Sequence, residues 1–128
     1  MAITTYDERA YFQRRLREEI ARCQRYHDVF TLVTLQARPS PGHTPTRRTT
    51  TVAARLLERR LRTSDVVDAV YEDVIAVLLI GTNASGMRDA EQRIRAALVA
   101  IGGTWELRKY AFPEQAAEIQ TLEVVAAA

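Results

Sequence analysis

The stretch from Arg62 to Thr82 limits the possible folds of this chain more than any other. It contains two runs rich in β-branched residues, 66–70 and 74–80, separated by the polar step Tyr71-Glu72-Asp73. Two such runs joined by a short polar step predict a β-hairpin. Hairpin turns of two residues usually contain Asn-Gly, Asp-Gly or Gly-Gly, because these residues tolerate positive φ angles. This tip contains no glycine, so its backbone is not predicted to approach a ligand closely.

The chain has the size and composition of one soluble globular domain. Its 128 residues can bury a hydrophobic core, and 47% of them are apolar and 27% charged. No apolar run approaches the roughly 18–20 residues that span a bilayer, and the N-terminus passes directly into charged residues, unlike a signal peptide. The single cysteine, Cys23, can form no internal disulfide or cysteine cluster. We therefore expect residues 1–128 to form one cytoplasmic domain without a metal or cofactor.

Helical periodicity predicts a long first helix that ends near Tyr26 or His27. Thr4 or Thr5 is expected to cap it, with Asp7 and Glu8 in the first turn, where the helix dipole favours acids. Its stripe positions recur every three or four residues, which indicates one buried face: Phe12, Leu16, Ile20, Cys23 and Tyr26 or His27. This spacing makes Cys23 a small core residue and not a nucleophile.

Two further helices are predicted on either side of the hairpin. The first of these begins at residues 49–51 and is expected to bury Val52, Leu56, Leu57 and Leu61, and to expose Arg55, Arg59 and Arg60. The second follows a cap at residues 83–85 and spans 87–101, with an inner face of Ala90, Ile94, Ala97 and Leu98. Gly102-Gly103 is expected to end it.

The remaining segments predict two more strands and a loop. Residues 29–35 are almost continuously apolar, which favours a central strand, and 105–112 form a strand that Pro113 ends. Residues 37–46 contain three of the four prolines and indicate an irregular loop. The tail from Glu114 fits either a helix or a strand. This order predicts an α/β (α+β) sandwich, in which helices flank a ferredoxin-like or palm-type antiparallel sheet whose centre includes the first strand and the hairpin.

Several strings in this order resemble the GGDEF family, the diguanylate cyclase domain of bacterial-type cyclic di-GMP signalling. The similar segments are 12–22, 56–82 and 110–113. Within them, Arg62-Thr63-Ser64-Asp65-Val66-Val67 and Ala76-Val77-Leu78-Leu79-Ile80-Gly81-Thr82 follow the family pattern most closely. The resemblance implies a palm-type sheet with a shortened C-terminus, in which the helix that carries a phosphate-binding lysine is missing or truncated.

The departures from the family fall on its active-site positions. The signature places the hairpin tip on Tyr71-Glu72-Asp73-Val74-Ile75, where only Asp73 keeps its type. In active members two glycines admit the nucleotide and acids bind metal, whereas Tyr71 and Glu72 add bulk and charge and Val74 lacks a carboxylate. The other metal-binding aspartate corresponds to Gln36 or a neighbour, and the Pro-rich loop replaces the guanine-reading segment. The resemblance therefore implies an inactive domain without catalytic or metal-binding residues.

One family feature is retained, the motif Arg62-Thr63-Ser64-Asp65. It resembles the inhibitory site that binds cyclic di-GMP, because an arginine can donate to guanine O6 and N7 and an aspartate can accept from the guanine N1–H and amino group. The further candidates, for neutralising the phosphates, are Arg59, Arg60, Arg55 or Arg93. A structural reading is also open, in which Arg62 complements the helix dipole and Asp65 shapes the turn.

The sequence thus favours a catalytically inactive signalling or regulatory domain with cyclic di-GMP as its candidate ligand. The alternative is a protein-interaction or homodimerisation module that uses the first helix, the acidic hairpin tip or an exposed strand edge. A nucleic-acid surface is less favoured. Residues 38–62 contain seven arginines and a single acid, but no aromatic residue lies among them and no known binding motif is present.

Overall fold

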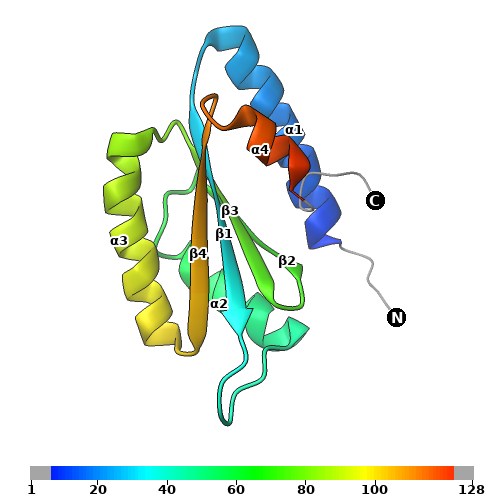
Figure 1. The fold of residues 1–128 in the computed structure, drawn as a ribbon, viewed down its shortest axis with the longest axis vertical. Helices are drawn as coiled ribbons and strands as arrows, with labels where there is room; N and C mark the ends of the chain where they lie inside the picture. The colour runs from blue at the N-terminus through cyan, green and yellow to red at the C-terminus, as the bar shows by residue number, and fades with distance from the viewer. Residues whose placement is uncertain (1–6, 123–128) are drawn as a thin grey trace.

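The computed structural model describes residues 7–122 and shows one sheet between two layers of helices (Figure 1). The elements in chain order are α1 (Glu8–Tyr26), β1 (Phe30–Arg38), α2 (Arg47–Glu58), β2 (Val66–Tyr71), β3 (Val74–Ile80), α3 (Ala84–Ile101), β4 (Thr104–Phe112) and α4 (Ala116–Thr121). No helix among the described residues combines the length and the apolar character that crossing a membrane requires.

The four strands form an antiparallel sheet in the order β2-β3-β1-β4. β1 pairs with β3 from Phe30↔Ile80 to Gln36↔Val74, and with β4 from Phe30↔Phe112 to Arg38↔Thr104. From β1 to β4 the order of elements is the β-α-β-β-α-β arrangement of ferredoxin-like folds. The predicted fold class and the central position of the first strand are confirmed. The hairpin, however, supplies only β3 to the centre, because β2 lies at an edge.

The side chains of β1 alternate between two hydrophobic cores. Val33 and Leu35 face one side, where they pack with β3 residues and with the inner faces of α2 and α3, including Leu57 and Ile94. The opposite core lies under α1 and α4 (Figure 1) and contains Phe12, Leu16, Phe30, Leu32, Leu78, Phe112 and Ile119. Both faces of the central strands are therefore buried, which explains their continuous apolar sequences.

The start of α1 differs from the sequence prediction. Asp7 is the N-cap, and its Oδ1 accepts hydrogen bonds from the backbone N–H groups of Arg9 at 3.1 Å and Ala10 at 3.2 Å. The expected caps, Thr4 and Thr5, lie outside the described residues. The predicted core face is confirmed from Phe12 to Cys23. Its predicted last position, Tyr26 or His27, is wrong: Tyr26 is 65% exposed, and the exposed His27 ends the helix in the left-handed conformation with φ 54°.

Helix α2 differs most from its predicted form. Thr46 and Thr49 form a reciprocal capping box, so the helix begins at Arg47 and ends before Leu61. Its buried face consists of Thr50, Ala53, Ala54 and Leu57, whereas Val52 and Leu56 are 52% and 41% exposed. The prediction that these two residues are buried is wrong, because two apolar stripes share this helix and the one with small alanines packs on the sheet.

The later elements follow the predictions closely. The Oδ1 of Asn83 accepts from the Gly86 N–H at 2.9 Å to cap α3, and Gly102, with φ 93°, ends it. β1 continues to Arg38, so the Pro-rich loop is shorter than predicted. The undecided tail contains α4, a helix of six residues.

The two leucines at positions 56 and 57 make a matched test of this packing. We expect Leu57→Ala to lower the free energy of unfolding by about 2–5 kcal/mol, because it leaves a cavity beneath α2. Leu56→Ala should cost less than about 1 kcal/mol, because its side chain is already partly in water. Urea unfolding followed by circular dichroism would measure both values, and equal losses would contradict the orientation of α2.

Candidate functional site

The hairpin tip is a two-residue turn of Glu72 and Asp73. Among the described residues other than glycine, only His27 has a positive φ, so this turn is not of the mirror-image type that suits tight hairpins. The register instead shifts between Ala69 and Tyr71, which leaves Val70 as a bulge. The hydroxyl of Thr50 on α2 also donates to the carbonyl oxygen of Glu72. The tip is therefore fixed by a bulge and by a helix contact in place of glycines.

Gln36, at the far end of β1, faces this tip. Its Nε2 donates to the carboxylate Oδ2 of Asp73 at 2.7 Å, and to the carbonyl oxygens of Asp73 and Ala37 at 3.4 Å each. The Ala37 N–H also donates to the Asp73 carbonyl oxygen at 2.8 Å. Three acceptors around Nε2 fix the orientation of the amide. The structure thus brings together Gln36 and Asp73, with Val74 opposite Gln36 in the ladder.

The donors at the tip do not fit the metal ions that the family resemblance implies. Mg²⁺ requires oxygen ligands, usually carboxylates and phosphate oxygens. Here the side-chain amide N–H of Gln36, and not a second carboxylate, faces Asp73. Within residues 7–122, no group of three or more His, Cys, Asp or Glu side chains is placed to hold a metal ion.

The surroundings of the tip are also poorly suited to phosphate. A hollow of about 360 Å³ beside it is lined by Ala37, Pro39, Thr44, Pro45, Tyr71, Glu72 and Asp73, which include two acids and no cation. Across the tip, a second hollow contains Arg38 and Arg108, but both arginines pair with Glu106. The guanidinium of Arg9 lies 5.2 Å from the Tyr71 ring centroid, over its face.

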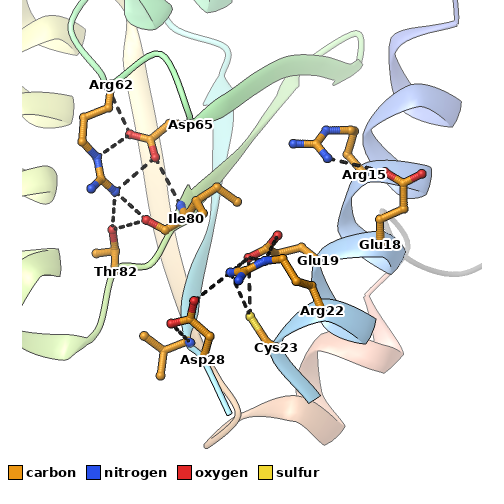
Figure 2. Close-up of polar contacts among 11 residues, drawn as sticks. Arg15, Glu18, Glu19, Arg22, Cys23, Asp28, Arg62, Asp65, Ile80 and Thr82 are labelled. Atoms are coloured by element: carbon orange, nitrogen blue, oxygen red, sulfur yellow. Dashed lines mark hydrogen bonds and ion pairs between the residues drawn. The ribbon is translucent and has the colours of Figure 1, made fainter. Parts of the chain in front are cut away.

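Arg62 and Asp65 point toward each other between the end of α2 and the end of β3 (Figure 2). The Asp65 side chain is 1% exposed. Its Oδ1 accepts from the Ile80 N–H at 3.2 Å and from Arg62 Nη2 at 3.3 Å, and its Oδ2 accepts from the Arg62 N–H at 3.2 Å. Arg62 Nη2 also donates to the Ile80 carbonyl oxygen at 2.6 Å and to Thr82 Oγ1 at 2.9 Å. These contacts tie the turn after α2 to the last residues of β3.

The same contacts determine which atoms of Arg62 and Asp65 are available to a ligand. The Arg62 side chain is 51% exposed, so one side of its guanidinium faces solvent. Both carboxylate oxygens of Asp65 are already hydrogen-bonded within the protein. Arg59 lines a hollow with Ala97, Ala100 and Ile101 between α2 and α3.

Comparisons with known proteins identify the fold. No model of a known protein family matches the sequence, and no curated protein is significantly similar to it. Solved structures do match, including the following two. A DGC protein from Thermotoga maritima has a TM-score of 0.74 over 93% of this chain and 94% of its own, at 21% identity. The GGDEF domain of TpbB (or YfiN) from Pseudomonas aeruginosa has a TM-score of 0.64 over 83% of this chain and 71% of its own, also at 21%.

The chain has the GGDEF-domain fold. The fold expected from the sequence resemblance is thereby confirmed. An identity of 21% shows the fold alone, so the activity of this GGDEF-fold domain has to be argued from its own residues.

A buried cluster of charged groups on this GGDEF-fold domain was not predicted from the sequence. Asp68 on β2 has a side chain only 4% exposed, and Arg55 Nη2 reaches its Oδ1 at 3.4 Å and the Glu8 Oε1 at 3.5 Å. The same arginine nitrogen donates to the Val67 carbonyl oxygen at 2.6 Å, and Glu8 Oε1 accepts from the Ala69 N–H at 3.0 Å. Arg55 therefore connects α1, α2 and β2, and its side chain is still 44% exposed, as the sequence predicts. The sequence feature that could have revealed this cluster is an acid, Asp68, within the β-branched run 66–70.

Burial is the main cause of an unusual protonation equilibrium at Asp68. Burial and, after it, the nearby charge of Glu8 raise the pKa of this carboxyl group to about 7, against the opposing effect of Arg55. Asp68 Oδ2 is buried and has no hydrogen-bond partner among residues 7–122. The neutral acid therefore suits this environment better than the carboxylate.

A second cluster explains the chemistry of the lone cysteine (Figure 2). Arg22 Nη2 donates to Glu19 at 2.6 Å and to Asp28 at 2.9 Å, and the Cys23 Sγ lies 3.4 Å from Glu19 Oε2. Burial, followed by the hydrogen bond with Glu19, raises the pKa of the Cys23 thiol to about 11. Cys23 is thus a protonated core thiol, as predicted, and not a reactive thiolate.

The raised pKa of Asp68 predicts how stability varies with pH. In the folded state this pKa is about 7, above a value of about 4 in the unfolded chain. Between these values the folded state binds more protons, so the stability that this group contributes falls as pH rises from about 4 to 7. We expect Asp68→Asn, which stays neutral, to lose this fall and to be more stable than wild type at pH 8 by about 1–3 kcal/mol.

Urea unfolding at a series of pH values would measure this difference. The matched control is Asp89→Asn, which changes an exposed acid on α3. Its curve should run parallel to that of the wild type. A parallel curve for Asp68→Asn as well would show that Asp68 does not titrate as described.

Proposed function

We propose that this GGDEF-fold domain is a catalytically inactive regulatory domain. The contact between Gln36 and Asp73 carries this proposal. A cyclase of this fold would need a second carboxylate opposite Asp73 to share a metal ion, and the amide N–H of Gln36 stands there instead, 2.7 Å from Asp73 Oδ2. An N–H donor directed at the carboxylate both occupies an acceptor and repels a cation.

The nucleotide side of the tip supports the same conclusion. Glu72 adds negative charge to a hollow that has no basic side chain in its lining. A triphosphate placed there would be repelled and would find no cation to neutralise it. Without glycines, the backbone of the tip also gives less room for a base or phosphate than the family signature does.

The candidate ligand of this regulatory domain is cyclic di-GMP, and its candidate site is Arg62 with Asp65. The half-exposed guanidinium of Arg62 supports this assignment, because it can donate to a guanine edge. Asp65 lies beside it but would have to exchange its bond with the Ile80 N–H for the guanine N1–H. Binding through this pair would therefore loosen the turn between α2 and β2. Arg59, three residues before Arg62 in the chain, stays a candidate for the phosphates, although it also lines the hollow between α2 and α3.

A protein-docking role is the second candidate function. It is favoured by exposed apolar side chains on α2, which the fold leaves uncovered. The two candidates differ in their ligands and sites, so separate measurements distinguish them.

The absence of cyclase activity is directly testable. With GTP and Mg²⁺ or Mn²⁺, we expect no cyclic dinucleotide by chromatography under conditions in which an active diguanylate cyclase, assayed in parallel, converts its substrate. Fluorescence of Trp105, the single tryptophan, should also show no saturable change with GTP. Formation of cyclic di-GMP by the purified wild type would refute the proposal.

Isothermal titration with cyclic di-GMP tests the ligand assignment. We expect wild type to bind and Arg62→Ala to lose about 1–3 kcal/mol of binding free energy, because a bidentate contact to guanine is removed. Arg88→Ala, which changes an exposed arginine on α3, is the control, and thermal melting would establish that each variant is folded. An absence of heat with wild type at high micromolar ligand would eliminate cyclic di-GMP binding and leave the docking role.

A further inference from the structure

The outward face of α2 carries apolar side chains that no part of the described chain covers. Val52 is 52% exposed and Leu56 is 41% exposed, and they lie one turn apart on the helix. Burial of either side chain would be favourable in free energy, because it removes apolar surface from water. Exposed aliphatic residues gathered in one place commonly mark a surface that binds another molecule.

Two adjoining hollows extend this apolar surface into a groove. The first, of about 290 Å³, lies among the 39–46 loop, α2, the end of α3 and Trp105. The second, of about 300 Å³, continues between the end of α2 and α3. Leu56 and Ile101 line both hollows, so they form one continuous depression. We refer to it as the α2–α3 groove, defined by Arg48, Val52, Leu56, Arg59, Ile101 and Trp105.

The charge of the groove has one sign. The charged residues that line the two hollows are Arg48, Arg59 and Arg60, and no acid is present among the lining residues. None of the three arginines forms an ion pair within residues 7–122. Arg48 also lies in the first turn of α2, where the helix dipole adds positive potential and no acid offsets it. Arg48 lies near one end of the groove, and Arg59 and Arg60 lie near the other, with the aliphatic side chains of Val52, Leu56 and Ile101 between them.

We propose that the α2–α3 groove binds an acidic amphipathic helix of a partner protein. The apolar side of such a helix, with anchors spaced by three or four residues, would cover Val52, Leu56 and Ile101. Its carboxylates would pair with Arg48 at one end and with Arg59 and Arg60 at the other. Arg48 lies at the start of α2, and Glu58 is the last residue of this helix. Their separation of ten residues corresponds to about 15 Å along the axis, which matches a partner helix of about three turns.

The groove suits a protein helix better than two other occupants. Single-stranded nucleic acid binds where cations alternate with several aromatic rings that stack on bases, whereas Trp105 is the one Phe, Tyr or Trp side chain among the residues that line the two hollows. A second copy of the chain, docked by a two-fold axis through the same groove, would bring its arginines toward those of the first copy. That arrangement would add like-charge repulsion.

The inference deepens the second candidate function, and it rests on the proposal that the domain acts by association and not by catalysis. The two proposals nevertheless fail separately. Cyclase activity would refute the inactive-domain proposal and leave the groove untouched, whereas the peptide experiment below requires no nucleotide.

Three probes test the proposed occupant. The first is a synthetic peptide of about 16 residues, with leucines spaced by three and four and glutamates on the flanking positions, long enough for the groove. The second is the same peptide with every glutamate replaced by lysine. The third is a single-stranded DNA 20-mer. Binding is followed by Trp105 fluorescence, since the chain has one tryptophan, and by amide chemical shifts.

We expect the acidic peptide to bind with a dissociation constant below 1 mM, with shifts at α2 and the end of α3. Leu56→Glu should weaken it by about ten-fold or more, because the substitution removes an apolar anchor and places a charge on the floor. Val99→Glu is the control, since Val99 is 83% exposed and lies outside the groove. Arg48→Glu with Arg59→Glu should also weaken binding, and circular dichroism would establish that all variants are folded.

Several results would overturn the proposal. These are no saturable binding of the acidic peptide up to 1 mM, equal binding of the lysine peptide, equal loss in Val99→Glu, or shifts that map away from the groove. DNA binding to the same amides would make the groove a nucleic-acid surface. Light scattering that shows a dimer abolished by Leu56→Glu would assign the groove to a second copy of the chain.

Discussion

The pairing of β1 with both β3 and β4 is the constraint on which the rest of the structure depends. Side chains alternate along a strand, so a slip of one residue would exchange the two faces of the sheet. The observed register directs Val33 and Leu35 to the core under α2 and α3, and Phe30 and Leu32 to the core under α1 and α4. The stacked rings of Phe30 and Phe112, with centroids 4.9 Å apart, stabilise this register at one end.

The same ladder places the two candidate sites at opposite ends of the sheet. Gln36 pairs with Val74 beside the hairpin tip, whereas Phe30 pairs with Ile80 beside Arg62 and Asp65. Six residue steps along β1 separate these ends, about 20 Å. A domain of this fold can therefore lack metal-binding and nucleotide-binding residues at its hairpin tip and still keep the Arg62–Asp65 pair. No contact of one site depends on the other.

Helix α2 takes part both in the packing on the sheet and in the docking surface proposed for the domain. Its inner face holds small residues against the sheet, Thr50 bonds to the hairpin tip, and Arg55 joins the buried Asp68 to the partly buried Glu8. Its outer face leaves Val52 and Leu56 in water beside unpaired arginines. One helix thus anchors the sheet and offers a surface for association, which is consistent with a domain whose output is a contact and not a reaction.

The sequence by itself determined the order of elements, the core face of α1, the central position of β1 and the identity of the residues at the tip. Local patterns suffice for these features, since periodicity and turn chemistry act over a few residues. Only the tertiary structure decided which apolar stripe of α2 is buried, that Gln36 donates to Asp73, and that Asp65 is closed by the Ile80 N–H. It also decided that Arg59 lines a hollow with residues of α3 and that Arg55 meets Asp68. These contacts join residues on different elements, and their geometry follows from the packing of helices on a sheet, which no local pattern specifies.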